Sequence, residues 1–332
     1  MKIFYGYKEI KGIKDPVAAI GIFDGMHIGH KRVINRLIKS GGSGRDKIVV
    51  TFDPHPRSVL NPGRILPRIM SLEHRLLMLE GMGVDAVVVV SFTDHVAGMS
   101  PEDFIEHIII GGIGARTVYV GSNFHFGRKK RGGVNTLKKM GRSHGVDVHC
   151  VRPVRRRGRT VSSTWVRKLI SEGRLETAEK LLRRPVSVLG TVVRGEARGR
   201  ELGFPTANID PHHEVIPPPG VYAVKADISG GIYDGVLNIG FKPTFYGKKL
   251  KKRKEPHIEA HIFGIDRDLY GASMEIFFIA KLRNEKKFRT KEALSEQIKV
   301  DAKKAKTLLS DTRTLSRILR YRKNRCVDML GR

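Results

Sequence analysis

The stretch VAAIGIFDGMHIGHKRVINRLIKS, residues 17–40, contains the order of elements that decides the fold of the first half of the chain. Residues 17–23 form a nearly continuous apolar run, which is typical of a strand buried on both faces of a sheet. A turn at Asp24 and Gly25 leads into residues 31–40, where apolar side chains recur at helical spacing. A buried strand, a tight turn and a helix predict the first unit of an α/β domain.

The same alternation continues to residue 154. The pattern predicts strands at 47–52, 85–92, 116–121 and 146–154, and helices at 71–83, 100–110 and 134–145. Alternation of this kind favours right-handed crossovers and a parallel, doubly wound, Rossmann-like sheet. Ligands of such sheets bind at the carboxyl ends of the strands.

The second half of the chain has a different pattern. One or two helices are expected at 164–182, and Pro185 then breaks the helical pattern, so we predict two domains, residues 1–184 and 185–332. Beyond this boundary, strands are expected at 186–195, 220–228, 233–240, 257–265 and 274–283 without intervening helices. They predict a small antiparallel β-barrel, followed by an amphipathic helix at 290–309.

The composition is that of a globular protein with few cysteines and a large positive charge. No apolar stretch of the 332 residues approaches the length of a membrane span, and the two cysteines form no disulfide framework, so we expect a cytoplasmic protein without membrane contact. The net charge of +29 attracts polyanions. Aromatic residues barely interleave the basic runs 152–159 and 248–255, so a nucleic-acid partner is disfavoured against a solvated basic surface. Self-association is left open.

The two histidines of the opening stretch stand at the start of the expected helix. His27 and His30 project from one side of the first turn, where free N–H groups and the helix dipole favour phosphate oxygens. Gly25 and Gly29 leave room for a ligand near the backbone. Two solvated or capping histidines are the plainer alternative, and a metal site is weaker because no third ligand is near in sequence. Neither a P-loop nor a G-x-G-x-x-G pattern is present.

Two further segments carry candidate functional groups. In residues 161–170, VSSTWVRKLI, Thr164 is expected to cap a helix and Arg167 to lie one turn further on, although for this segment taken alone an ordinary capped helix is the favoured interpretation. In residues 199–209, GRELGFPTANI, the oxygens of Thr206 and Asn208 suit Mg²⁺, with a barrel loop as the alternative. Glu259 lies among apolar neighbours of a strand and is either paired or catalytic.

These motifs together resemble a known family. The turn at 21–30 and the Ser-Ser-Thr-x-x-Arg segment resemble the two signatures of the nucleotidyltransferase superfamily. The segments TFDPHP at 51–56, YVGSNFHFG at 119–127 and PTAN at 205–208, with Glu-x-His at 259–261, extend the resemblance over both domains. The chain is identified as a member of the bacterial bifunctional riboflavin kinase/FAD synthetase family.

The resemblance implies two reactions. The C-terminal domain is expected to phosphorylate riboflavin with ATP, giving FMN, and the N-terminal domain to transfer AMP from ATP to FMN, giving FAD and pyrophosphate. ATP is then a co-substrate, Mg²⁺ the cofactor, and riboflavin, FMN and FAD the other ligands. The alternatives are an adenylyltransferase for a different phosphate substrate, with a regulatory barrel, or a basic nucleic-acid-binding protein.

The resemblance also implies roles for individual residues. His27, His30 and Glu259 are the expected catalytic residues. The adenylyltransferase site is expected to bind ATP through Gly21, Phe23, Asp24, Gly25, Gly29, Ser163, Thr164 and Arg167, and flavin through Asp53, Pro54, His55, Asn123 and Phe126. The kinase site is expected to bind ATP and Mg²⁺ through Gly199, Arg200, Gly203, Pro205, Thr206 and Asn208, the last pair as metal ligands, and flavin through Asn238, Tyr270, Arg283 and Glu285. Met26, Ser122 and His125 depart from the usual family residues.

Overall fold

The computed structural model describes residues 1–8, 10–42, 44–61, 67–195, 203–212, 214–243 and 254–323. These residues divide into two compact units. Unit 1 comprises residues 1–67 and 72–166, and unit 2 comprises residues 68–71 and 167–323. Each unit has its own sheet and its own core.

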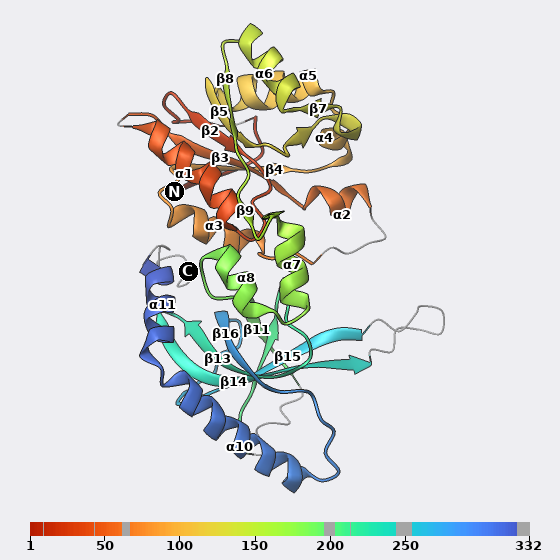
Figure 1. The fold of residues 1–332 in the computed structure, drawn as a ribbon, viewed down its shortest axis with the longest axis vertical. Coiled ribbons are helices and arrows are strands. Elements are labelled where there is room, and N and C mark those ends of the chain that lie inside the picture. The colour runs from red at the N-terminus through yellow and green to blue at the C-terminus, as the bar shows by residue number, and fades with distance from the viewer. Residues whose placement is uncertain are drawn as a thin grey trace. The chain divides into compact units, whose positions relative to one another are not determined.

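Unit 1 contains a six-stranded parallel sheet with the order β1-β4-β3-β2-β5-β8 (Figure 1). The strands are β1 (Lys2–Tyr5), β2 (Val17–Ile20), β3 (Lys47–Asp53), β4 (Ala86–Ser91), β5 (Thr117–Gly121) and β8 (Asp147–Val151). The predicted doubly wound sheet is therefore confirmed. The edge strand β1 was not predicted, because only four residues form it and their burial is partial.

Helices lie between these strands, together with short elements after β5 and β8. The helices are α1 (Ile28–Gly41), α2 (Pro56–Leu60), α3 (Leu72–Glu80), α4 (Asp94–Gly98), α5 (Pro101–Asp103) and α6 (Val134–Ser143). The short elements are β6 (His125–Phe126), the 3₁₀ turn η2 (Arg128–Lys130), β7 (Gly132–Gly133), β9 (Arg155–Arg156) and β10 (Arg159–Thr160). The predicted α-helix at 100–110 differs: after one α turn, residues Phe104–Ile113 form a π-helix, η1.

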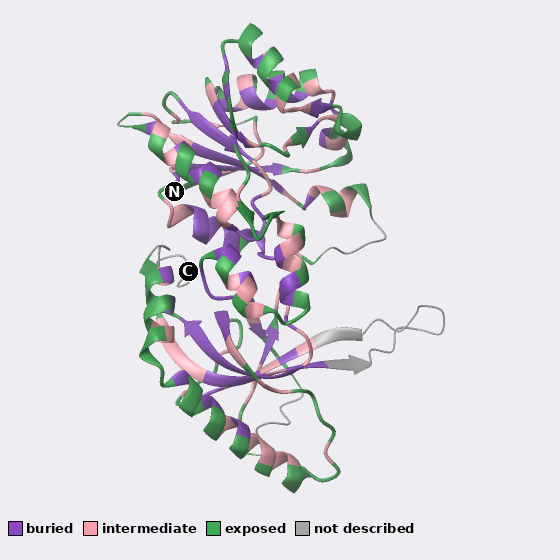
Figure 2. Ribbon diagram, in the orientation of Figure 1, coloured by how far each residue is buried: buried purple, intermediate pink, exposed green. Residues whose placement is uncertain are grey.

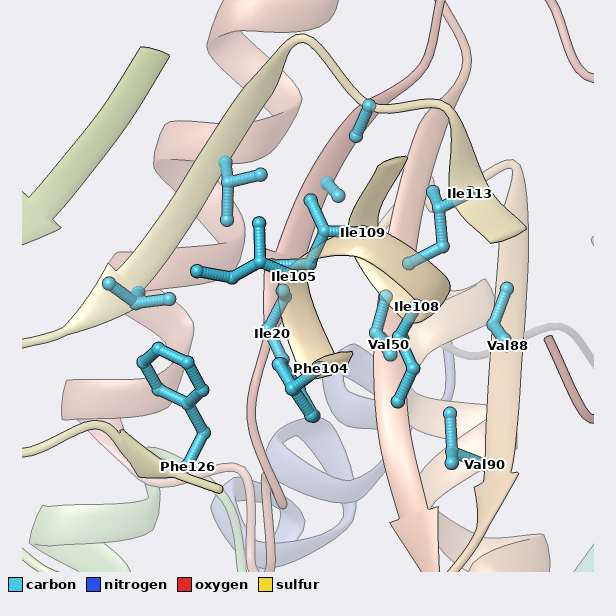
Figure 3. Packing of buried hydrophobic residues seen from close by; sticks show 14 of the residues in the cluster. Ile20, Val50, Val88, Val90, Phe104, Ile105, Ile108, Ile109, Ile113 and Phe126 are labelled. Atoms are coloured by element: carbon cyan, nitrogen blue, oxygen red, sulfur yellow. The ribbon is translucent and has the colours of Figure 1, made fainter. Parts of the chain in front are cut away.

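One hydrophobic cluster of unit 1 lies between the central strands and η1. Figure 3 shows Ile105, Ile108 and Ile109 of η1 packed against strand residues Ile20 and Val50. Phe104 and Phe126 extend this cluster. The central strands β2 and β4 are buried along all or nearly all of their length (Figure 2), which explains why their sequences are continuous apolar runs rather than alternating ones.

Unit 2 contains a closed antiparallel barrel with the strand order β11-β12-β15-β14-β13-β16. Its strands are β11 (Ser187–Val193), β12 (Ala207–Asp210), β13 (Gly220–Ile228), β14 (Gly231–Pro243), β15 (Lys254–Ile262) and β16 (Ser273–Arg283). Before the barrel come α7 (Ser163–Ser171), which crosses from unit 1 into unit 2, and α8 (Leu175–Leu182). The predicted barrel is confirmed, with β12 as an additional strand.

Two helices follow the barrel where one was expected. They are α10 (Lys291–Leu309) and α11 (Thr312–Lys323). α10 packs along β13, β14 and β16, and Ala305 and Leu309 bury their side chains against Val221, Ala223 and Val236. The C-terminal half of this amphipathic helix therefore buries its apolar side chains against the barrel.

Candidate active sites

The sheet order of unit 1 brings three of the predicted segments together at one edge of the sheet, the edge formed by the carboxyl ends of the strands. β2 lies between β3 and β5, and all three strands are parallel, so their carboxyl ends are adjacent. The histidine turn follows β2, the Asp53–His55 segment follows β3, and the Asn123–Phe126 segment follows β5. From β2 the chain continues to β3 on one side of it and later to β5 on the other side. The carboxyl end of β2 is therefore the switch point, the place where doubly wound sheets bind ligands.

The turn after β2 is built from unusual backbone conformations. Phe23, Gly25 and Met26 have φ values of 53°, 87° and 45°, all in the left-handed region, so the chain reverses sharply before α1 begins. His27 is the N-cap of α1, and its Nδ1 accepts a hydrogen bond from the backbone N–H of His30 at 3.3 Å. The two imidazole rings stack with centroids 3.7 Å apart. The predicted common side of His27 and His30 is thus confirmed.

Burial keeps both histidines neutral. Loss of solvation lowers the pKa of His27 to about 4, although Asp24 and a backbone hydrogen bond oppose part of this effect. Burial also places the pKa of His30 well below its usual value, and the neighbouring His27 and Arg75 lower it further. A neutral imidazole has one donor and one acceptor nitrogen. Because Nδ1 of His27 already accepts a hydrogen bond, its proton lies on Nε2, which is left as a donor.

Close contacts fix the residues around the histidines. The Phe23 ring covers Gly21, where a Cβ would lie 2.9 Å from the ring, and meets His30 edge-to-face at 5.5 Å. A Cβ at Gly29 would lie 3.1 Å from the His27 ring. Both glycines are therefore needed for the packing of the turn.

The start of α7 is fastened to this turn. The hydroxyl of Ser163 donates to the carbonyl oxygen of Asp24 at 2.9 Å. Ser162, rather than the predicted Thr164, caps the helix, because its Oγ accepts from the N–H of Trp165 at 3.3 Å. Thr164 lies in the first turn of α7, and Arg167 lies one turn further along the same helix. Each hydroxyl of the Ser-Ser-Thr run suits an N-cap, so the sequence alone does not decide which of these residues caps α7.

Sequence reasoning missed Arg75, a buried arginine on α3. Its guanidinium donates to the carbonyl oxygen of Ile22 at 2.7 Å and to Oγ1 of Thr51 at 2.6 Å, and it lies 3.9 Å from the carboxylate of Asp53. It therefore ties the ends of β2 and β3 together and adds positive charge near His30. The available signal was an arginine within the apolar run of 71–83.

The expected flavin-side residues of unit 1 follow β3 and β5. His55 is buried and caps α2, accepting from the N–H of Arg57 at 3.1 Å, and Pro54 lies between it and Asp53. Phe126 is buried against Phe124 and Phe104. The carbonyl of Asn123 bonds the ring of His125 at 2.9 Å. A separate cavity of about 780 Å³ lies against η1, and its lining includes His95, Asp103 and His107 rather than the histidine turn.

In unit 2, the barrel register places three predicted residues in one row. Glu259 of β15 lies directly opposite Asn208 of β12 on one side and opposite Asn238 of β14 on the other. Residues opposite one another in a sheet share a face, so all three side chains lie on the same face of the barrel wall. The flanking Ile258 and Ala260 are buried on the other face, as their alternation with Glu259 predicts.

Two histidines on β15 support this row. Nε2 of His257 lies 2.7 Å from Oε1 of Glu259, with both side chains partly exposed. Nδ1 of His261 hydrogen bonds the carbonyl oxygen of Pro205 at 2.8 Å, and the His261 ring meets that of Phe204 edge-to-face. Since a carbonyl only accepts, Nδ1 of His261 carries the proton. His261 thereby holds the segment that leads into Thr206 and Asn208.

Asn208 is the most confined residue of the row. Its side chain lies over Gly195, where a Cβ would come within 1.8 Å of Nδ2. The residue is buried, and its Oδ1 has no hydrogen-bond partner among the described residues. Thr206 and Pro205 directly precede β12, and Gly203 adopts a φ of 80°. Gly199 and Arg200, which were expected to bind ATP, lie outside the described residues.

The expected flavin residues of the barrel lie on or beside β14 and β16: Asn238 is within β14, Arg283 ends β16, and Tyr270 and Glu285 flank β16. A Cβ at Gly240 would lie 2.7 Å from Oε1 of Glu285 and 3.7 Å from Nδ2 of Asn238, so both side chains lie close to Gly240. Tyr270 is exposed. Arg283 does not pair with Glu259; its Nε lies 2.8 Å from Oδ2 of the buried Asp301. Arg283 is therefore not the partner in the paired alternative left open for Glu259.

Comparison with known proteins shows the family of both domains. A family model described as FAD synthetase matches residues 10–165, and one described as riboflavin kinase matches residues 182–309. The chain is 35% identical over 302 residues to the bifunctional riboflavin kinase/FMN adenylyltransferase of Bacillus subtilis, which covers 90% of this chain and 93% of that protein. It is also 35% identical to the protein of the same name from Pseudomonas fluorescens, over 88% of this chain and 92% of that protein. The chain belongs to the bifunctional riboflavin kinase/FMN adenylyltransferase family.

The enzyme accordingly has an N-terminal FAD synthetase domain and a C-terminal riboflavin kinase domain. It phosphorylates riboflavin with ATP and transfers AMP from ATP to FMN. A crystal structure titled as a macrolide-efflux protein from Streptococcus pneumoniae is similar to it, with a TM-score of 0.75, 28% identity, and coverage of 91% of this chain and 97% of that one. Among the described residues, no helix is long and apolar enough to cross a membrane.

Proposed function

We propose that the histidine turn of unit 1 carries out the adenylyl transfer. In this proposal the Nε2–H of His27 and the ring of His30 donate to the phosphates of ATP and stabilise the charge that develops as the bond to pyrophosphate breaks. Nδ1 of His30 is buried without a hydrogen-bond partner among the described residues, which supports a ligand as its missing partner. Gly21, Phe23, Asp24, Gly25, Gly29, Ser163, Thr164 and Arg167 complete the ATP site.

FMN is proposed to bind beside ATP at the same sheet edge. Asp53, Pro54, His55, Asn123 and Phe126 are the proposed flavin residues, and the supporting observation is that they follow β3 and β5, the two neighbours of β2. At this edge the phosphate of FMN can approach the α-phosphate of ATP, while Arg75 supplies positive charge from below. Orientation of two reactants in this way removes much of the entropic barrier.

The row on the barrel is proposed to carry out the kinase reaction. Glu259 takes the proton from the terminal ribityl hydroxyl of riboflavin as that oxygen attacks the γ-phosphate of ATP. Gly199, Arg200, Gly203 and Pro205 are the proposed ATP residues, and Asn238, Tyr270, Arg283 and Glu285 are the proposed flavin residues. The ion pair of Arg283 with Asp301 suits a positioning role for this arginine at the end of β16.

Magnesium is proposed to bind at Thr206 and Asn208. The buried, unpartnered Oδ1 of Asn208 fits this proposal, because an amide oxygen left without a donor is the kind of ligand that a hard cation prefers. Bound there, the ion would neutralise charge on the phosphates of ATP. Two residues of this chain would hold the Asn208 carboxamide in place. Gly195 lies against the carboxamide, and His261 of β15 hydrogen bonds the segment that precedes Asn208.

Three broader assignments are also proposals. Residues 1–184 are proposed as the adenylyltransferase domain and 185–332 as the kinase domain, since the family matches end at 165 and begin at 182. A cytoplasmic location is supported by the low cysteine content. Self-association, left open by the sequence, is a possibility that oligomeric-state measurements would test.

The site assignments are tested by two reciprocal variants. His30→Ala is expected to lower FAD formation from supplied FMN by about 10²–10³-fold and to leave FMN formation from riboflavin unchanged. Glu259→Gln keeps the shape of the side chain but removes its basicity, and is expected to lower the kinase rate by about 10²-fold or more while FAD formation continues. Equal loss of both activities in either variant would contradict the assignment of one reaction to each site.

A further inference from the structure

The arginine-rich run at 152–159 forms a defined hairpin in unit 1. β9 and β10 pair antiparallel, with Arg156 opposite Arg159. The two residues between these strands, Arg157 and Gly158, have φ values of 49° and 72°. Two successive left-handed residues make a type I′ turn, the tight connection that suits the twist of a hairpin. The run is therefore an ordered structure with a fixed position rather than an irregular basic loop.

Both ends of this hairpin are fastened to the histidine turn. On the incoming side, Arg32 of α1, two residues after His30, donates to the carbonyl oxygens of Arg152 and Pro153, both at 3.4 Å. On the outgoing side, the carbonyl oxygen of Val161 lies 3.8 Å from the position of a Cβ on Gly29. Ser163, two residues later, bonds the carbonyl of Asp24. The base of the hairpin thus lies beside the first turns of α1 and the proposed phosphate site.

Among the residues that the structure describes, no carboxylate forms an ion pair with the arginines of the hairpin. Arg152, Arg155, Arg156, Arg157 and Arg159 are all exposed. Arg155 donates to the carbonyl of Gly158, and Arg159 lies over the ring of Trp165, contacts that leave the positive charge in place. No acidic residue occurs in the sequence between Asp147 and Glu172.

The histidine turn itself lacks such charge. His27 and His30 are neutral near pH 7, because burial lowers the pKa of each. They offer hydrogen-bond donors to phosphates but no attraction at long range. Adenylyl transfer nevertheless brings together two polyanions, ATP and FMN, which repel one another. A fixed group of like charges at the mouth of a site raises the local concentration of such ligands and their association rate.

We propose that the hairpin of residues 152–159 is a docking surface for the β- and γ-phosphates of ATP, and for the pyrophosphate that they become. The arginines draw ATP to the histidine turn and offset the repulsion between ATP and FMN, while the neutral histidines make the directed contacts. This proposal rests on the proposed role of the histidine turn.

Three of the arginines allow a clean test. Arg152, Arg156 and Arg157 have exposed side chains that do not support the hairpin through the contacts described above, so Arg152→Gln, Arg156→Gln and Arg157→Asn remove charge and little else; asparagine tolerates the left-handed conformation at 157. The matched control, Lys138→Gln, Lys139→Gln and Arg142→Gln, removes the same charge from exposed positions of α6.

The triple hairpin variant is measured in both reactions at several salt concentrations. We expect kcat/KM for ATP in FAD formation to fall about tenfold or more at low salt, with the loss shrinking as salt rises. We expect kcat at saturating ATP and all kinase parameters to stay within about twofold, and inhibition by added pyrophosphate to weaken about tenfold. The α6 variant should change none of these values by more than about twofold.

Several outcomes would overturn the proposal. The first is an equal loss of kcat/KM for ATP in the α6 variant, which would indicate a general effect of the protein's charge. The others are an unchanged kcat/KM for ATP in the hairpin variant, or a loss in that variant that does not depend on salt. Weaker binding of a single-stranded RNA oligonucleotide with unchanged ATP kinetics would instead mark the hairpin as a nucleic-acid surface. If His30→Ala retained FAD formation, the role of the histidine turn would fail. If that variant lost it and the hairpin variant behaved as wild type, only the hairpin proposal would fail.

Discussion

Nδ1 of His27 accepts the backbone N–H of His30 at 3.3 Å, and the two rings stack 3.7 Å apart. This pair defines the start of α1, the tautomer of His27 and the neutral state of both imidazoles. Because the turn buries two stacked histidines, protonation of either imidazole is unfavourable in the folded protein. The geometry that orients hydrogen-bond donors toward phosphate therefore also makes the stability of the fold sensitive to acid.

The free energy of unfolding should therefore depend on pH through His27. Its pKa is about 4 in the folded protein against a usual 6.5, so the unfolded chain binds this proton first as the pH falls. The contribution is fully present above pH 6.5 and is lost between pH 6.5 and 4, by about 3 kcal/mol. Urea unfolding across this range checks it. His27→Asn should flatten this part of the pH profile, and an identical profile in both proteins would count against a buried neutral histidine.

Asn208→Ala should weaken the use of MgATP by the kinase. Loss of the buried amide oxygen removes a proposed metal ligand, so the Mg²⁺ concentration for half-maximal FMN formation should rise about tenfold or more. FAD formation from FMN should be unchanged. A Mg²⁺ titration of both reactions measures this, and an unaltered midpoint in the kinase reaction would exclude Asn208 as a ligand.

Gly195→Ala should imitate the loss of Asn208 without changing that residue. The new methyl group would lie 1.8 Å from the present position of Asn208 Nδ2 and must displace the carboxamide. We expect the same direction of change in the Mg²⁺ midpoint, and no further change when Asn208→Ala is added. Additive effects in the double variant would mean that Gly195 acts elsewhere.

His257 should matter only through Glu259. The contact of 2.7 Å orients the proposed base, so His257→Ala should lower the kinase kcat about tenfold with little change in KM for riboflavin. His257→Gln, which retains a donor, should restore part of the rate. The decisive comparison is made in a Glu259→Gln background, where His257→Ala should have no further effect. A full additional loss there would show that His257 does not act on Glu259.

Much of this protein follows from local sequence. The continuous apolar run before Asp24 determined a buried strand, and the helical spacing after His30 determined the helix, because both patterns arise from burial along a few neighbouring residues. The family motifs then indicated which side chains matter. Local patterns were insufficient where several solutions have similar energies: Ser162 and Thr164 both suit an N-cap, and the periodicity of 100–110 does not distinguish an α-helix from a π-helix.

Other features were decided by tertiary structure alone. The sheet order, with β2 between β3 and β5, brings three distant segments to one edge, and the barrel register sets Glu259 between Asn208 and Asn238. Arg75 reaches the ends of two strands because α3 packs beside them. The physical reason is the same in each case. Sheet order and register depend on which apolar faces are buried against which, over separations of tens of residues, and no local pattern contains that information.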